Sequence, residues 1–218
     1  MRRPDSSRAW RPGAAPHSPA TSPAPRLAAV LVAVAMALGA CSAGAPESAE
    51  KPPAPVSAGG AATLPGPVPS ALALRPAPTD SPGAPAFTGA LTDGTPLTAA
   101  TLWADRPVVL LFLSSWCTIC ADRQDALSDL ARSYRDQVVF VGVASEDEPA
   151  DLDAYLRDHR VEFPVVFDRD QTIWQSYAVR EPPAVAIVAK GGALLRGWPG
   201  GIDAAALDAR LRELVIAG

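Results

Sequence analysis

The sequence predicts an α/β fold in which helices flank a central mixed sheet. Three continuously apolar stretches, 108–113, 138–144 and 163–167, are typical of strands that are buried on both faces. Helical patterns separate these stretches, which is the order of a parallel sheet covered by helices. The chain then closes with a hairpin pattern around 190–192 and a final helix, so antiparallel strands complete the sheet.

The periodicity and the turn residues assign an element to each stretch of the domain. Asp93-Gly94 is a strong turn signal. Pro149 opens a helix, because proline is tolerated in the first helical turn. Leu207 and Leu211 lie on one stripe of the last helix. In chain order the expected elements are a strand at 86–91, a helix at 98–103, a strand at 108–113, a helix after Cys117, a strand at 138–144, a helix at 150–159, a strand at 163–167, a helix at 172–177, a hairpin at 185–189 and 193–198, and a C-terminal helix.

The first forty residues have the pattern of an export signal. Residues 1–26 hold five arginines, and residues 27–40 are fourteen apolar or small residues. This run is shorter than the roughly 20 residues of a membrane span and suits a signal-peptide core. Its end, Leu38-Gly39-Ala40-Cys41, resembles the lipobox of bacterial lipoproteins, which implies cleavage before Cys41 and a lipid on the Cys41 thiol. The alternative is an ordinary secretory signal that is cut nearby.

Composition divides the remainder into a tether and a domain. We expect residues 41–83 to be a tether that begins at the lipidated Cys41, because ten of the 42 residues after that cysteine are proline. Residues 84–218 are long enough for one core. Residues 1–41 carry five of the 19 basic and one of the 23 acidic residues, so the rest has a net charge of −8. This charge disfavours nucleic acid as a partner.

Cys117 and Cys120 are the only cysteines of the expected domain. They follow a buried strand and open a helix, so the helix dipole and free backbone N–H groups would stabilise a Cys117 thiolate. Cys120 lies one turn further along the same face, close enough to form a disulfide. The spacing predicts a thiol–disulfide active site in which an exposed Cys117 reacts first and a more buried Cys120 resolves the mixed disulfide.

The residues around the pair complete this prediction. Trp116 would shield the sulfurs and offer an apolar platform, while Thr118 and Ile119 would line the rim. A zinc site would need four ligands, and the domain adds only His159. An inert structural disulfide remains an alternative, as is common in exported proteins.

The order of motifs resembles the thioredoxin fold and, more narrowly, the extracytoplasmic TlpA/ResA-type proteins. The matching stretches are APAF, DGTPL, PVVLLFLSSWCTIC, VVFVGVASEDE, EFPVVFD, SYAVREPPAVAIV and the closing helix. The resemblance implies that Pro183 is a cis-proline facing the disulfide and that the backbone of Pro182 meets an incoming peptide. A peroxiredoxin would need proline at Leu110, so antioxidant activity is not expected, although Ser114 fits that pattern.

Three positions depart from the family pattern. Ile119 stands where proline is usual, and Pro182 has no N–H for a substrate backbone. Leu111 and Arg123 occupy the positions at which thioredoxin and ResA-type proteins keep an acid near the thiols. We therefore expect proton transfer at Cys120 to use water or a group that the sequence does not identify.

The resemblance implies a lipid-anchored, extracytoplasmic thiol:disulfide oxidoreductase. It favours a reductase of protein disulfides, as in cytochrome maturation, that receives electrons from a membrane thiol carrier. No cofactor, metal or nucleic acid is implied. One alternative is an oxidase that forms disulfides in secreted proteins. Another is a non-catalytic tethered binding module with a structural disulfide.

Overall fold

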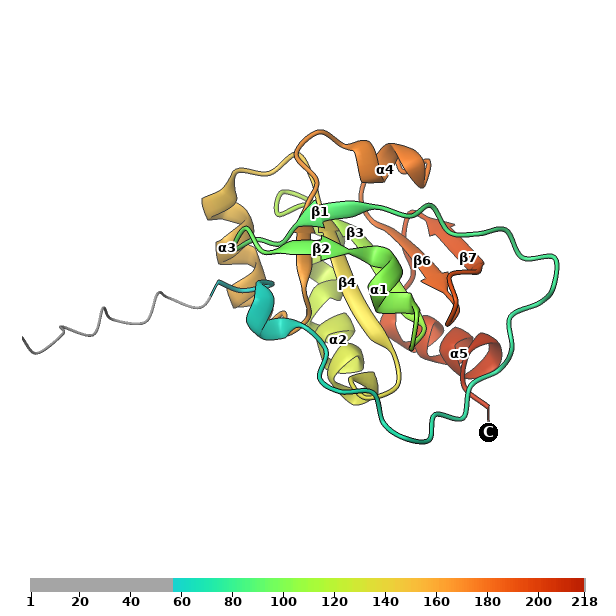
Figure 1. The fold of residues 1–218 in the computed structure, drawn as a ribbon. Coiled ribbons are helices and arrows are strands. Elements are labelled where there is room, and N and C mark those ends of the chain that lie inside the picture. The colour runs from blue at the N-terminus through green and yellow to red at the C-terminus, as the bar shows by residue number, and fades with distance from the viewer. Residues whose placement is uncertain (1–56, 218) are drawn as a thin grey trace, which may run out of the picture. The chain divides into compact units, whose positions relative to one another are not determined.

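The computed structural model describes residues 57–217, and its centre is a five-stranded mixed sheet. The strand order is β5-β4-β3-β6-β7, with β3, β4 and β5 parallel and with β6 and β7 antiparallel to their neighbours (Figure 1). The predicted mixed sheet is confirmed. Its strands are β3 (Val108–Leu113), β4 (Val139–Ala144), β5 (Val165–Phe167), β6 (Ala184–Val188) and β7 (Leu194–Pro199).

Helices cover both faces of the sheet and divide the core in two. On one face the core residues of α2, α3 and α5 pack against β3 and β4. On the other face α1, α4 and a small hairpin cover the same strands (Figure 1). The helices are α1 (Ala99–Trp103), α2 (Thr118–Tyr134), α3 (Pro149–Asp158), α4 (Thr172–Ser176) and α5 (Ala204–Leu214), preceded by a 3₁₀ turn at Ala61–Thr63.

The two central strands explain why the sheet is covered on both sides. All six residues of β3 and all six of β4 are buried, which is what their unbroken apolar sequences predict. Gly142 lies where a Cβ would come within 2.9 Å of the Val165 side chain, so β4 needs a glycine to fit beside β5.

The short hairpin before α1 differs in part from the prediction. The first strand is β1 (Thr88–Ala90), and its antiparallel partner β2 (Pro96–Thr98) was not expected as a strand. Asp93 stabilises the turn between them, because its carboxylate accepts a hydrogen bond from Thr95 N (2.9 Å). The hydrogen bonds from the backbone N–H groups of Ala61 and Thr95 lower the pKa of Asp93.

Residues 57–83, which we name the strap, lie against the domain, so the expected boundary at residue 84 was wrong. The strap has few apolar residues for a core of its own, but its carbonyls accept hydrogen bonds from N–H groups at the sheet edges and helix ends. These bonds run from Val165 N to Gly59 O (2.8 Å), from Arg106 Nη2 to Gly66 O (2.8 Å), from Ala217 N to Ala73 O (3.0 Å) and from Leu194 N to Pro82 O (2.8 Å).

The signal peptide at 1–40, the start of the tether and the lipidated Cys41 lie outside the described residues. Within residues 57–217, no helix has both the length and the apolar character to cross a bilayer.

Candidate active site

Cys117 and Cys120 form a disulfide at the start of α2. Cys117 is the N-cap residue of this helix, and its sulfur accepts a hydrogen bond from the backbone N of Cys120 (3.0 Å). The strand β3 ends four residues earlier, so a buried strand delivers the first sulfur to a helix N-terminus. In the reduced protein the same N–H and the helix dipole stabilise a thiolate at this position.

The expectation that Cys117 is exposed was wrong. The side chains of Cys117 and Cys120 are exposed by only 5% and 4%, because the first sulfur folds back over the opening turn of α2 and bonds to the second. The surface at this point belongs instead to Trp116 (56% exposed) and Ile119 (49%), together with the exposed Thr118. An incoming partner therefore meets these three side chains before it reaches sulfur.

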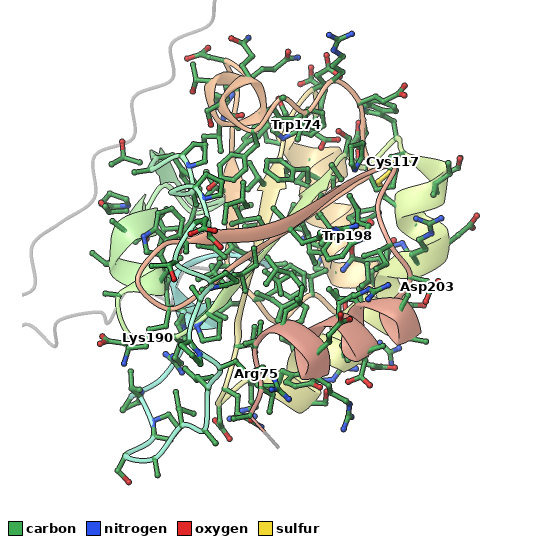
Figure 2. The ribbon with its side chains drawn as sticks, turned by 90° about the vertical axis from the view of Figure 1, so that its right-hand side faces the viewer. Arg75, Cys117, Trp174, Lys190, Trp198 and Asp203 are labelled. Atoms are coloured by element: carbon green, nitrogen blue, oxygen red, sulfur yellow. A yellow bond between two sulfur atoms is a disulfide. The ribbon has the colours of Figure 1, made fainter. Side chains whose placement is uncertain are left out.

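The loop before β6 approaches the disulfide. The Pro182–Pro183 peptide bond is cis, as the resemblance implied. Pro183 and Cys120 line a cavity of about 20 Å³, and Gly201 from the loop after β7 closes it. A Cβ at Gly201 would come 2.9 Å from Pro183, so a glycine is required here. Figure 2 shows β7 ending near Cys117, in agreement with this cavity.

No acid lines this cavity among the residues that the structure describes. Leu111 is buried in β3, and Arg123 donates a hydrogen bond to the Gly200 carbonyl (Nη1–O 3.0 Å). A cation, rather than a carboxylate, therefore stands one helical turn beyond Cys120. Within residues 57–217 there is also no group of three metal-binding side chains.

A buried amide that the sequence analysis missed lies one turn after Cys120. Gln124 is 2% exposed, donates to Ser128 Oγ (3.2 Å) and accepts from the Tyr155 hydroxyl (3.2 Å). Burial raises the pKa of Tyr155, so this phenol stays protonated as a donor. The spacing of four residues from Cys120 was the signal for Gln124, because it places both on one helix face.

Three consecutive residues before Cys117 are bound to the loop after β4. We call this set of contacts the turn clamp. The Ser114 hydroxyl donates to the Ser145 carbonyl in this set. The three pairs are Ser114 Oγ with Ser145 O (2.6 Å), Ser115 N with Asp147 Oδ1 (2.8 Å) and Trp116 Nε1 with Glu146 O (2.9 Å).

Asp147 is the ionisable member of the turn clamp. Burial raises the pKa of the Asp147 carboxyl, and the hydrogen bonds from Ser115 oppose this shift. The sequence analysis gave Asp147 no part in the site and missed this contact. The position of Asp147 just after β4 could have indicated the contact. The strands β3 and β4 are parallel neighbours, so the loops that follow them meet at one edge of the sheet.

A larger groove lies beside this site on the other face of β6 and β7. It has a volume of about 520 Å³ and runs between the loop at 177–181 and the end of β7. Ala184, Ala186 and Gly197 are among its lining residues, and their small side chains leave the space open. The groove ends at Gly200, next to the residue that closes the cavity at Cys120.

Residues 82–196 match the AhpC/TSA family. The soluble secreted antigen MPT53 of Mycobacterium tuberculosis is 31% identical over 98 residues, which are 45% of this chain and 56% of MPT53. The match therefore spans little more than half the length of this relative.

Two solved structures share the fold. One is a secreted disulfide oxidoreductase of Mycobacterium tuberculosis described as homologous to Escherichia coli DsbE, with 26% identity and a TM-score of 0.54 over 59% of this chain and 96% of that one. The other is the exposed lipoprotein thioredoxin Etrx1 of Streptococcus pneumoniae, with 26% identity and a TM-score of 0.53 over 60% and 100%. Together with the mixed sheet and the disulfide at the start of α2, these matches show that the chain belongs to the AhpC/TSA family and has a thioredoxin-like fold.

Proposed function

We propose that this protein is a thiol–disulfide oxidoreductase that acts on cysteines of protein substrates. The observation that carries this proposal is the place of Cys117 at the N-terminus of α2, with its sulfur bonded to Cys120 and facing the Cys120 N–H. A structural disulfide needs no such donor, whereas a leaving or attacking thiolate is stabilised by it. The relative described as a secreted disulfide oxidoreductase supports the same assignment.

The exchange proceeds in two steps that conserve electrons. In the reduced protein the Cys117 thiolate attacks one sulfur of a substrate disulfide, and the other substrate sulfur leaves as a thiolate. The Cys120 thiolate then attacks Cys117, releases the second substrate thiolate and restores the disulfide of the structure. Two electrons pass to the substrate, and two must return from a donor dithiol for the next cycle.

The exposed surface and the groove supply places for a protein substrate. Trp116 and Ile119 form an apolar rim around sulfur atoms that are themselves buried. The groove of about 520 Å³ between the loop at 177–181 and Gly200 has room for side chains of a peptide segment, and Glu181 and Ala184, which flank the cis bond, line it. We propose that Pro182 and Pro183 contact this segment through carbonyl and ring atoms, because neither has an N–H to donate.

We propose that the protein works outside the cytoplasm as a lipoprotein anchored through Cys41 and that it reduces disulfides, for example in cytochrome maturation. The electrons would come from a membrane thiol carrier. The names of a secreted relative and of an exposed lipoprotein support this location. The export-signal pattern of residues 1–40 agrees with secretion, and the lipobox-like ending at Cys41 agrees with a lipoprotein.

The opposite direction, disulfide formation in secreted proteins, is favoured by one observation. Arg123 places a positive charge at the cavity that Cys120 lines. A nearby cation stabilises thiolates and hence the reduced form, which makes a couple more oxidising.

The deciding measurement is the reduction potential of the Cys117–Cys120 couple, equilibrated with glutathione in the chain from residue 42 onward. That form keeps every described residue and has no other cysteine. A value near about −270 mV supports reduction, and one near about −120 mV supports oxidation. If the disulfide does not exchange with glutathione and Cys117→Ser leaves the function of the protein unchanged, the protein is a non-catalytic binding module with a structural disulfide.

A further inference from the structure

The turn clamp joins the residues before Cys117 to a single ionisable side chain. Asp147 Oδ1 accepts from both the backbone N (2.8 Å) and the hydroxyl of Ser115. Ser115 lies two residues before Cys117 in the sequence. The carbonyl of the preceding Ser114 accepts a hydrogen bond from the backbone N–H of Cys117 (N–O 3.1 Å). Asp147 thus fixes the backbone that sets the direction of the Cys117 side chain.

The loop that carries Asp147 is itself held in an unusual conformation. Glu146 has a φ of +57°, a left-handed value that residues with a side chain rarely adopt. In this conformation its carbonyl accepts from Trp116 Nε1, and its carboxylate accepts from Gln171. Backbone strain of this kind is found where the surrounding structure imposes a geometry for function.

The second oxygen of Asp147 costs stability. Oδ2 is buried and has no hydrogen-bond partner among the described residues. A buried polar atom without a partner is destabilising. The charged groups around it do not compensate, because Glu146 of the same loop and Asp151 of α3 are both acidic and raise the Asp147 pKa further.

We infer that Asp147 is a positioning residue for Cys117, which holds the Ser114–Trp116 turn so that the Cys117 sulfur stays over the N-terminus of α2. This inference deepens the proposed oxidoreductase activity and rests on it. When the turn is released, the sulfur leaves the Cys120 N–H that it accepts at 3.0 Å. A thiolate at Cys117 then loses its donor and forms less readily.

Two substitutions separate position from charge. Asp147→Asn and Asp147→Ala both remove the negative charge, but only asparagine keeps an oxygen for the two Ser115 donors. Each is made in a full chain with Cys41→Ser and Cys120→Ser, so that Cys117 is its only cysteine and alkylation is read on the peptide that holds it. The readout is the rate of alkylation of reduced Cys117 by iodoacetamide as a function of pH, followed on that peptide by mass spectrometry.

We expect Asp147→Ala to be alkylated about three- to tenfold more slowly at pH 7 than Asp147→Asn, through a raised Cys117 pKa, because the acceptor of both Ser115 hydrogen bonds is lost. Ser115→Ala, which removes only the hydroxyl donor, should slow the reaction alone but not further in Asp147→Ala, where that hydroxyl has already lost its acceptor. Glu148→Ala is the control, as it removes an exposed neighbouring charge that caps nothing through its side chain.

Equal pH profiles for Asp147→Ala and Asp147→Asn would overturn the inference. If both are unchanged, Asp147 is only structural, and if both pKa values fall together, its charge acts directly on the thiolate. Alkylation needs no disulfide partner, so this result is independent of whether the couple exchanges with glutathione. A failure of the proposed activity and a failure of the positioning role therefore give different observations.

Discussion

The Arg123 guanidinium donates to the Gly200 carbonyl (Nη1–O 3.0 Å) and ties α2, one turn after Cys120, to the loop that follows β7. Both Arg123 and Cys120 line the small cavity beside Pro183. The site therefore has a positive charge where ResA-type proteins often keep an acid.

We expect the Arg123 charge to make the couple more oxidising. Arg123→Gln should lower the reduction potential by about 5–20 mV, because a partly exposed charge contributes up to about 1 kcal/mol and about 30 mV corresponds to 1.4 kcal/mol. Arg123→Lys, which keeps the charge, is the control and should stay near the native value. Equal potentials for the two variants would show that the charge of residue 123 does not set the potential.

The loop after β7 contains a matched pair of glycines for a second test. Gly200 and Gly201 both have left-handed φ values (+79° and +71°), but only a Cβ at Gly201 meets Pro183, at 2.9 Å. Alanine should strain the backbone at both positions, and Gly201→Ala should cost about 1–3 kcal/mol more through overpacking. Urea unfolding measures the difference, and equal losses would mean that Pro183 yields freely.

Removal of the strap should destabilise the domain. A chain that begins at residue 84 loses four backbone hydrogen bonds, those of Gly59, Ala73, Arg75 and Pro82 with Val165, Ala217, Val215 and Leu194. At roughly 1 kcal/mol for each of them, the free energy of unfolding should fall by about 4 kcal/mol relative to a chain that begins at residue 52. Coincident urea transitions for the two chains would contradict the packing of the strap.

Asp147 should lower the free energy of unfolding as pH rises, whereas an acid in a salt bridge lowers it as pH falls. Burial raises its pKa in the folded protein above 3.8, the ordinary value of an aspartate side chain, so the folded state binds the proton more tightly than the unfolded state. The unmodified protein should therefore lose stability as pH rises from 3.8 through the folded pKa. Asp147→Asn does not titrate and should gain relative to the native chain over that interval, measured by urea unfolding at a series of pH values. A constant difference between the two proteins would contradict the raised pKa.

Periodicity predicted the parts of the fold in which burial follows directly from sequence. The continuously apolar β3 and β4 were identified with little or no error in their ends, because strands covered on both faces have no polar positions. The strand β2 was missed, since three residues with one buried leucine give no periodic signal. The composition of residues 57–83 predicts a mobile tether, because it shows that they cannot form a core. Composition does not show that N–H groups at the edges of the sheet can bind their carbonyls.

The sequence by itself determined the chemistry: two cysteines at a spacing of three, after a buried strand and at the start of a helix, specify a redox pair because helix geometry alone brings the sulfurs together. Only the tertiary structure decided the environment of that pair. Two of its features are hydrogen bonds between residues more than 30 positions apart in the sequence, from Ser115 to Asp147 and from Arg123 to Gly200. The third is the burial of Cys117. Such contacts depend on which strand ends and loops meet at one edge of the sheet, and this is fixed by packing rather than by local pattern.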